Sequence, residues 1–245
     1  MNHGQRIFLA GASGAIGRRL IPLLLAAGYH VTGTTRSLGK AEQLRALGAE
    51  PIVVDVFNAD ELLHAVVSAR PRVVIHQLTD LPPGLAPDRM AAALPRNARL
   101  RDEGTRHLVA AAIAAGAERI VAQSIAWMYR PGPEPHREGD PLDTEAAGTR
   151  RVSVDAVVAL ERQTLETPAI EGVVLRYGQL YGPGTGTEVA AGALPLHVDA
   201  AAYAALLAVD RGTPGIYNVA EPNAYMITNR ARLELGWAPA FRLGA

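Results

Sequence analysis

The 245-residue sequence contains no cysteine and only one lysine, Lys40. Without cysteine there can be no disulfide, no thiolate catalysis and no cysteine-ligated metal. The seven histidines are scattered, and no two of them form a His-x-x-x-His pair that would place both rings on one face of a helix. We therefore expect no metal site.

The sequence has no excess of positive or negative charge, because 24 Lys and Arg residues balance 24 Asp and Glu residues. Without a net field, neither nucleic acid nor an anionic membrane surface is an expected partner. No apolar run is long enough to span a bilayer, and the chain reaches its first apolar run without a signal-like segment. We expect a cytoplasmic protein that acts on a small molecule.

An apolar run passes directly into a glycine-rich turn in residues 6–17, Arg-Ile-Phe-Leu-Ala-Gly-Ala-Ser-Gly-Ala-Ile-Gly. A turn between a strand and a helix can bring backbone N–H groups against a pyrophosphate. Gly11 would make the tight turn, Gly14 would let phosphates approach, and Gly17 would let helix and strand pack closely. The alternative is an ordinary strand-to-helix turn. The cofactor-binding residues expected here are Gly11, Ser13, Gly14, Ala15, Ile16 and Gly17.

Strand-like and helix-like segments alternate over the first half of the chain. With 49% hydrophobic residues, the chain can bury the core of one α/β domain. The alternation predicts a doubly wound parallel sheet with right-handed crossovers. Residues 81–95 contain four prolines and are expected to form a loop with at most one turn of helix. Strands are expected at 30–34, 51–54, 73–76, 119–123 and 171–177, and helices at 40–47, 61–68, 99–115, 152–167 and 200–209.

The Gly-x-x-Gly-x-x-Gly spacing resembles that of the extended and atypical short-chain dehydrogenase/reductase superfamily, the NAD-dependent epimerase/dehydratase family. Residues 175–184, with Leu-Arg followed by Tyr-Gly-Pro, and residues 234–239, Glu-Leu-Gly-Trp-Ala-Pro, resemble two further signatures of this family. The resemblance implies a Rossmann-type NAD(P)-binding domain in residues 1–180. Residues 181–245 would form a small C-terminal substrate lobe, which is shortened relative to the family.

The cofactor preference is expected to depend on Arg36, which follows the second strand. An arginine there can pair with the 2′-phosphate of NADP, whereas an acidic residue would bind the ribose hydroxyls of NAD. A solvated arginine is the alternative, so NADP is the expected cofactor and NAD the second choice. The resemblance implies that Asp55 accepts from the adenine amino group, although a turn or helix-capping role fits it as well. It also implies contacts of the cofactor with Val56, Gln77, Leu78, Thr79 and Tyr177.

The family's acid/base pair is Tyr-x-x-x-Lys on the helix expected at 152–167. The lysine lowers the pKa of the tyrosine so that it can exchange a proton near neutral pH. Since Lys40 is the only lysine, the motif cannot be present. If Glu161 is matched to the glutamate common in the family, Ser153 and Val157 occupy the places of the tyrosine and the lysine.

Two catalytic candidates remain, Ser124 and Tyr129, in the segment that resembles the family's stretch after the fifth strand. Ile125 occupies the place of the hydroxyl residue that orients the substrate in the family. The sequence thus predicts an NAD(P)-dependent oxidoreductase or epimerase with a nonstandard proton transfer, or with a substrate that takes hydride from the cofactor and its proton from water. The rival hypothesis is a non-catalytic NADP-sensing regulator. In relatives the helix expected at 99–115 often forms a homodimer interface.

Overall fold

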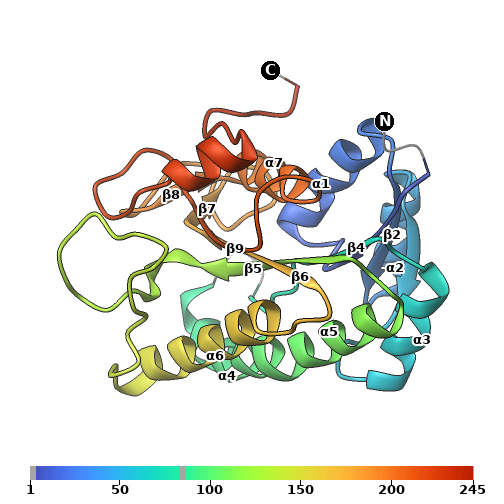
Figure 1. Cartoon of the computed structure of the whole chain (residues 1–245), viewed down its shortest axis with the longest axis horizontal. Helices are drawn as coiled ribbons and strands as arrows, with labels where there is room; N and C mark the ends of the chain where they lie inside the picture. Colours follow the sequence, from blue (N-terminus) through green and yellow to red (C-terminus); the bar gives the residue numbers. More distant parts are fainter. Residues whose placement is uncertain (1–3, 83–85, 245) are drawn as a thin grey trace.

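A computed structural model describes residues 4–82 and 86–244. Its centre is a seven-stranded parallel sheet in the order β3-β2-β1-β4-β5-β6-β9 (Figure 1). The order reverses between β1 and β4, which is the place where open α/β sheets bind ligands. The strands are β1 (Arg6–Ala10), β2 (His30–Thr35), β3 (Glu50–Val53), β4 (Val73–His76), β5 (Arg119–Ile125), β6 (Glu171–Tyr177) and β9 (Gly215–Val219).

Helices cover both faces of this sheet, as the alternation of segments predicts (Figure 1). Each face is closed by its own apolar cluster, one centred on β1, α1 and α7 and the other on α3 and α5. Residues 7–10 of β1 are all buried, which is why this strand reads as a continuous apolar run. The helices are α1 (Ala15–Ala26), α2 (Leu38–Ala46), α3 (Ala59–Ala69), α4 (Pro87–Arg99), α5 (Thr105–Ala114), α6 (Gly148–Leu165) and α7 (Val198–Leu207).

The expected loop at 81–95 is wrong over most of its length, because α4 begins at Pro87. Proline fits the first turn of a helix, where its missing N–H has no intrahelical partner. Residues 83–85 of this stretch lie outside the described residues. A π-helical turn, η2 (Leu100–Gly104), then separates α4 from α5. This turn interrupts the helix that the sequence predicts at 99–115. This turn bears on the site described below.

The C-terminal part of the chain returns to the main sheet through α7 and β9. Before that return, β7 (Gln179–Tyr181) and β8 (Pro195–His197) pair in a second, two-stranded sheet. His197 caps α7, since its Nδ1 accepts from the Asp199 N–H, whereas Asp199 itself pairs with Arg19 and accepts from the Leu243 N–H. The N-cap of α7 is therefore His197, and Asp199 lies in the first turn of the helix.

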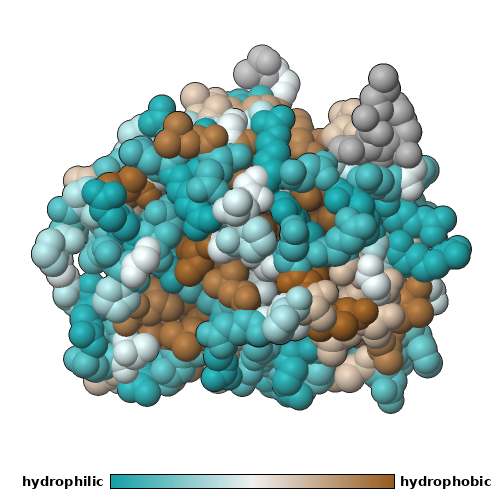
Figure 2. Space-filling model, viewed as in Figure 1, coloured by the Kyte–Doolittle hydropathy of each residue, from teal (hydrophilic) through white to brown (hydrophobic). Residues whose placement is uncertain are grey.

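Hydrophilic residues cover much of the face shown in Figure 2, and apolar residues form separate patches between them. Within residues 4–82 and 86–244, no helix combines the length and hydropathy needed to cross a bilayer.

Candidate cofactor and substrate site

The glycine turn between β1 and α1 is shaped by three different steric requirements. Gly11 has a φ of +86°, and a Cβ on it would lie 2.5 Å from the Gln77 carbonyl oxygen. A Cβ on Gly17 would lie 2.5 Å from the carbonyl oxygens of Gly11 and Ala12. Gly14 differs, because its Cβ would meet only the Gly11 carbonyl oxygen, at 3.3 Å. Two of the glycines thus preserve the packing of the turn, and the third keeps its outer side open.

The N-terminus of α1 carries no side-chain cap. Gly14 occupies the cap position, with φ −77° and ψ 176°, and no acidic residue lies in the first turn. The first backbone N–H groups of a helix have no intrahelical partner, and together with the helix dipole they attract an anion. The turn is therefore built to hold a phosphate group, and it satisfies the requirement of a dinucleotide site.

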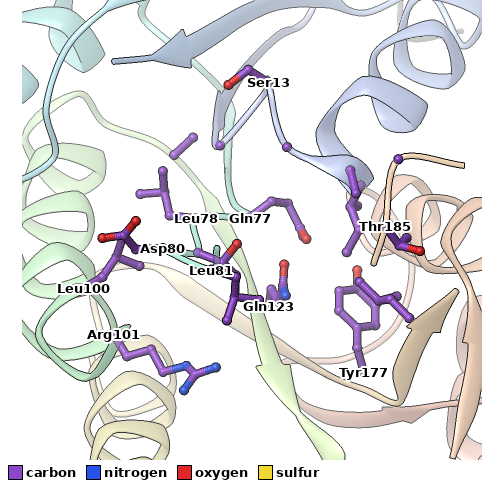
Figure 3. Close-up of a pocket in the computed structure, with 18 of the residues that line it drawn as sticks. Ser13, Gln77, Leu78, Asp80, Leu81, Leu100, Arg101, Gln123, Tyr177 and Thr185 are labelled. Atoms are coloured by element: carbon purple, nitrogen blue, oxygen red, sulfur yellow. The ribbon is translucent and has the colours of Figure 1, made fainter. Parts of the chain in front are cut away.

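One continuous cavity of about 790 Å³ runs from this turn along the C-terminal edge of the sheet. That volume is typical of sites for small molecules and cofactors. Among the residues that the sequence singles out, only Gly17, Ser124 and Tyr129 are missing from the described lining. The lining includes Gly11, Ser13, Gly14, Ala15, Ile16, Arg36, Asp55, Val56, Gln77, Leu78, Thr79 and Tyr177 (Figure 3 labels several of them).

One end of the cavity is basic, at the C-terminal end of β2. Arg36 is 56% exposed there, and its guanidinium lies 3.5 Å from an Asp80 carboxylate oxygen. Ser37 caps α2 by accepting from the Lys40 N–H, so that the N-terminus of α2 also faces this end. The lone lysine lines the same corner. Two cations and a helix N-terminus together suit a phosphate group.

The inner end of the cavity is lined by uncharged polar groups at the ends of β4, β5 and β6. Gln77 is only 4% exposed, and neither atom of its amide makes a hydrogen bond within the described residues. The polar ends of Gln77, Gln123 and Tyr177 point into the same space (Figure 3). Tyr177 donates its hydroxyl proton to the Ala201 carbonyl oxygen, and burial raises its pKa, so that it stays protonated. Gln123 was not identified from the sequence.

His76, at the end of β4, is a neutral structural histidine. Its Nδ1 accepts from the Leu78 N–H, which leaves Nε2 to donate to the Thr105 hydroxyl. Burial and the nearby charge of Arg101 lower the pKa of His76 to about 4. It therefore carries no charge at neutral pH.

Ser124 lies on the opposite side of β5 from the cavity. Side chains alternate along a strand, and the cavity lining takes Gln123 and Ile125 but not the residue between them. The Ser124 hydroxyl donates to the Glu161 carboxylate at 2.8 Å, and Glu161 pairs in turn with Arg176. All three side chains are buried, in a network that joins β5, α6 and β6.

Tyr129 is also directed away from the cavity. Its hydroxyl donates to the Asn218 side-chain oxygen at 2.6 Å, and its ring stacks on His136 at a centroid distance of 4.8 Å. Burial raises the pKa of Tyr129 above its usual value. The two sequence-based catalytic candidates thus lie outside the described cavity lining, and their catalytic role remains a prediction.

A protein-family model described as NAD(P)H-binding matches residues 11–196. The 3-diazoavenalumate denitrifying reductase of a Streptomyces species is 40% identical over 98% of this chain and 85% of its own length. The dTDP-4-dehydrorhamnose reductase of Streptomyces griseus is 31% identical over 73% of this chain and 51% of its own length. The chain therefore belongs to the NAD(P)H-binding family.

Solved structures of epimerases share the fold. The UDP-glucose 4-epimerase of Thermotoga maritima gives a TM-score of 0.77 at 18% identity, covering 98% of this chain and 95% of that chain. The UDP-glucuronic acid 4-epimerase of Bacillus cereus, in complex with UDP-glucuronic acid and NAD, also gives 0.77, at 16% identity and with the same coverage. At such identities the similarity establishes the fold alone.

Proposed function

We propose that this protein is an NADPH-dependent reductase whose substrate accepts a hydride without a proton from a protein side chain. The proposed substrate class is a small diazonium compound, by analogy with the named activity of the relative at 40% identity. The observation that carries the proposal is a large cavity whose inner end holds no group suited to proton transfer near neutral pH.

That observation follows from the ionisable groups of the described lining. Asp55 accepts from the Phe57 N–H, and Asp80 pairs with Arg36 and Arg96 toward the basic end. Among the inner-end groups Gln77, Gln123 and Tyr177, only Tyr177 is ionisable, and its pKa is raised, whereas Arg101 lines the cavity next to Leu100. A tyrosine with a pKa above 10 and its proton donated elsewhere is a poor acid or base at pH 7. Lys40 lies at the basic end of the cavity, so no lysine is near Tyr177 to lower its pKa as the lysine of a Tyr-x-x-x-Lys pair would.

The residues present fit a bound nicotinamide dinucleotide. The glycine turn and the N-terminus of α1 would hold its pyrophosphate, and Arg36, Ser37 and Lys40 would hold the 2′-phosphate that distinguishes NADP from NAD. Gln77 would use its unpartnered amide at the inner end. When bound in reduced form, the cofactor supplies a hydride there.

A diazonium substrate matches such a site because its reduction needs no proton. The cation R–N₂⁺ and one hydride give R–H and N₂, so that the carbon–nitrogen bond breaks, a carbon–hydrogen bond forms and the charge is balanced. A ketone, in contrast, becomes an alcohol only when its oxygen receives a proton, the task of the missing tyrosine. The chain's own task is to exclude water, to orient the substrate and to hold it at the inner end.

The first test is calorimetric titration of the purified protein with NADPH and NADH. We expect NADPH to bind more tightly, and Arg36→Ala to weaken NADPH about tenfold or more while leaving NADH unchanged, since a charge-assisted phosphate contact contributes about 1.5–3 kcal/mol. Arg45→Ala is the matched control, because Arg45 is an exposed arginine of α2 outside the cavity lining. If Arg36→Ala binds NADPH as tightly as the wild type does, or if the wild type binds NADPH and NADH equally, the NADP assignment is refuted.

The second test is oxidation of NADPH by benzenediazonium, compared with the same reaction without protein. Acceleration with release of N₂ is expected. Tight NADPH binding without turnover of this probe or of other hydride acceptors would instead support the NADP-sensing regulator.

A further inference from the structure

Arg101 differs from Arg36, the other arginine of the described cavity lining, because its charge is not paired. It lines the cavity, and no hydrogen bond or ion pair joins its guanidinium to residues 4–82 or 86–244. The sequence outside these ranges contains no Asp or Glu. Burial lowers the pKa of Arg101 to about 10. A half-buried guanidinium without an acidic partner is costly to the folded state.

The acidic neighbours of Arg101 in the chain are already engaged. Asp102 accepts from the Gln163 amide at 2.8 Å, and Glu103 pairs with Arg99 at 2.6 Å. His76, the ionisable group that Arg101 influences most directly, is neutral. The cavity wall therefore carries a positive charge at Arg101 that no ion pair in the described chain compensates.

The π-helical turn η2 carries Arg101 into the cavity wall. A π-helical turn inserts a residue into an otherwise α-helical run, changes which side chains face inward, and is frequently found at functional sites. Arg101 belongs to the cavity lining, and Figure 3 shows its side chain extending from this helix below Leu81 and Gln123. The unpartnered amide of Gln77 lines the same cavity.

We infer that Arg101 binds the carboxylate of the substrate, so that the reductase acts on organic acids rather than on neutral molecules. The statement that the acid is reduced rests on the proposed function, whereas the binding of a carboxylate by Arg101 does not. A guanidinium makes two parallel hydrogen bonds to a carboxylate, which fixes the orientation as well as the position of the acid. The carboxylate would supply the charge that the folded chain lacks.

The test uses inert acids, so that it does not depend on turnover. The full-length protein saturated with NADP⁺ is titrated with cinnamate and with cinnamamide, its neutral counterpart. We expect the wild type to bind cinnamate at least about tenfold more tightly than the amide. Arg101→Gln should abolish that difference, Arg101→Lys should restore part of it, and Arg106→Gln, an exposed arginine on α5, should change nothing.

Three results would overturn the inference. The first is equal binding of cinnamate and cinnamamide by the wild type, and the second is cinnamate binding by Arg101→Gln as tight as that of the wild type. The third is a loss of NADP⁺ affinity in Arg101→Gln, which would make Arg101 a cofactor ligand. The Arg101→Gln protein should also melt no lower than the wild type, because it loses a charge without a partner, whereas a structural role requires it to melt lower. If cinnamate binding depends on Arg101 but no diazonium compound is reduced, the proposed reaction fails and the carboxylate site stands.

Discussion

Gly14 is the position at which binding can be separated from folding. Its φ and ψ are open to any residue, and an added Cβ would meet only one backbone oxygen, at 3.3 Å. We expect Gly14→Ala to change the free energy of unfolding by less than about 1 kcal/mol, or a few degrees in Tm for a chain of this size. The methyl group would instead stand where the pyrophosphate must approach the backbone.

The magnitude of the binding loss follows from the contacts that are removed. Keeping the pyrophosphate away from the turn removes at least one charge-assisted hydrogen bond of about 1.5–3 kcal/mol, so NADPH should bind about tenfold to a hundredfold more weakly. Calorimetry gives the affinity, and thermal unfolding without cofactor gives the stability. Gly17→Ala is the contrasting variant, because its Cβ would lie 2.5 Å from two carbonyl oxygens and should lower Tm itself. A folded Gly14→Ala protein with wild-type affinity for NADPH would refute the reasoning.

Three further predictions concern the buried polar groups. The pKa of His76 is about 4 in the folded chain and near 6.5 in the unfolded chain, so the unfolded state takes up a proton first as the pH falls. The wild type should therefore lose about 3 kcal/mol of unfolding free energy between pH 6.5 and 4. Denaturant titrations should show that His76→Gln lacks this loss. Arg176→Met leaves Glu161 buried without its partner and should cost about 3–5 kcal/mol in the same assay, most of which a second substitution, Glu161→Leu, should restore. Tyr129→Phe removes the hydrogen bond to Asn218, and should cost about 1 kcal/mol in stability but leave kcat within about twofold, whereas a collapse of kcat would show that Tyr129 is catalytic after all.

The cofactor end of the site is the part that the sequence predicts best. The spacing of the three glycines is a local signal, and Gly17 approaches only atoms of the turn itself, although Gly11 approaches Gln77, which follows β4. The alternation of apolar segments likewise reports burial on both faces of a parallel sheet. These features can be found without knowing how distant segments meet.

The substrate end is harder to predict because small shifts decide which way a side chain faces. The strand expected at 119–123 continues to Ile125, and its alternation directs Ser124 into a buried network and Gln123 into the cavity. Arg101 lies in a helix-prone run where nothing in the spacing signals the π-helical turn. Its unpaired state depends on contacts with other elements, which only the folded chain reveals.

The central claim is that reduction proceeds without a proton donor from the protein. The measurement that tests it most directly mixes protein loaded with one equivalent of NADPH with 4-carboxybenzenediazonium, and follows NADPH absorbance and N₂ release from pH 6 to 9. We expect one N₂ for each NADPH oxidised, faster than with free NADPH, at a rate that shows no inflection over this range. No acceleration over free NADPH, or a rate that follows the titration of a single side chain, would contradict the account.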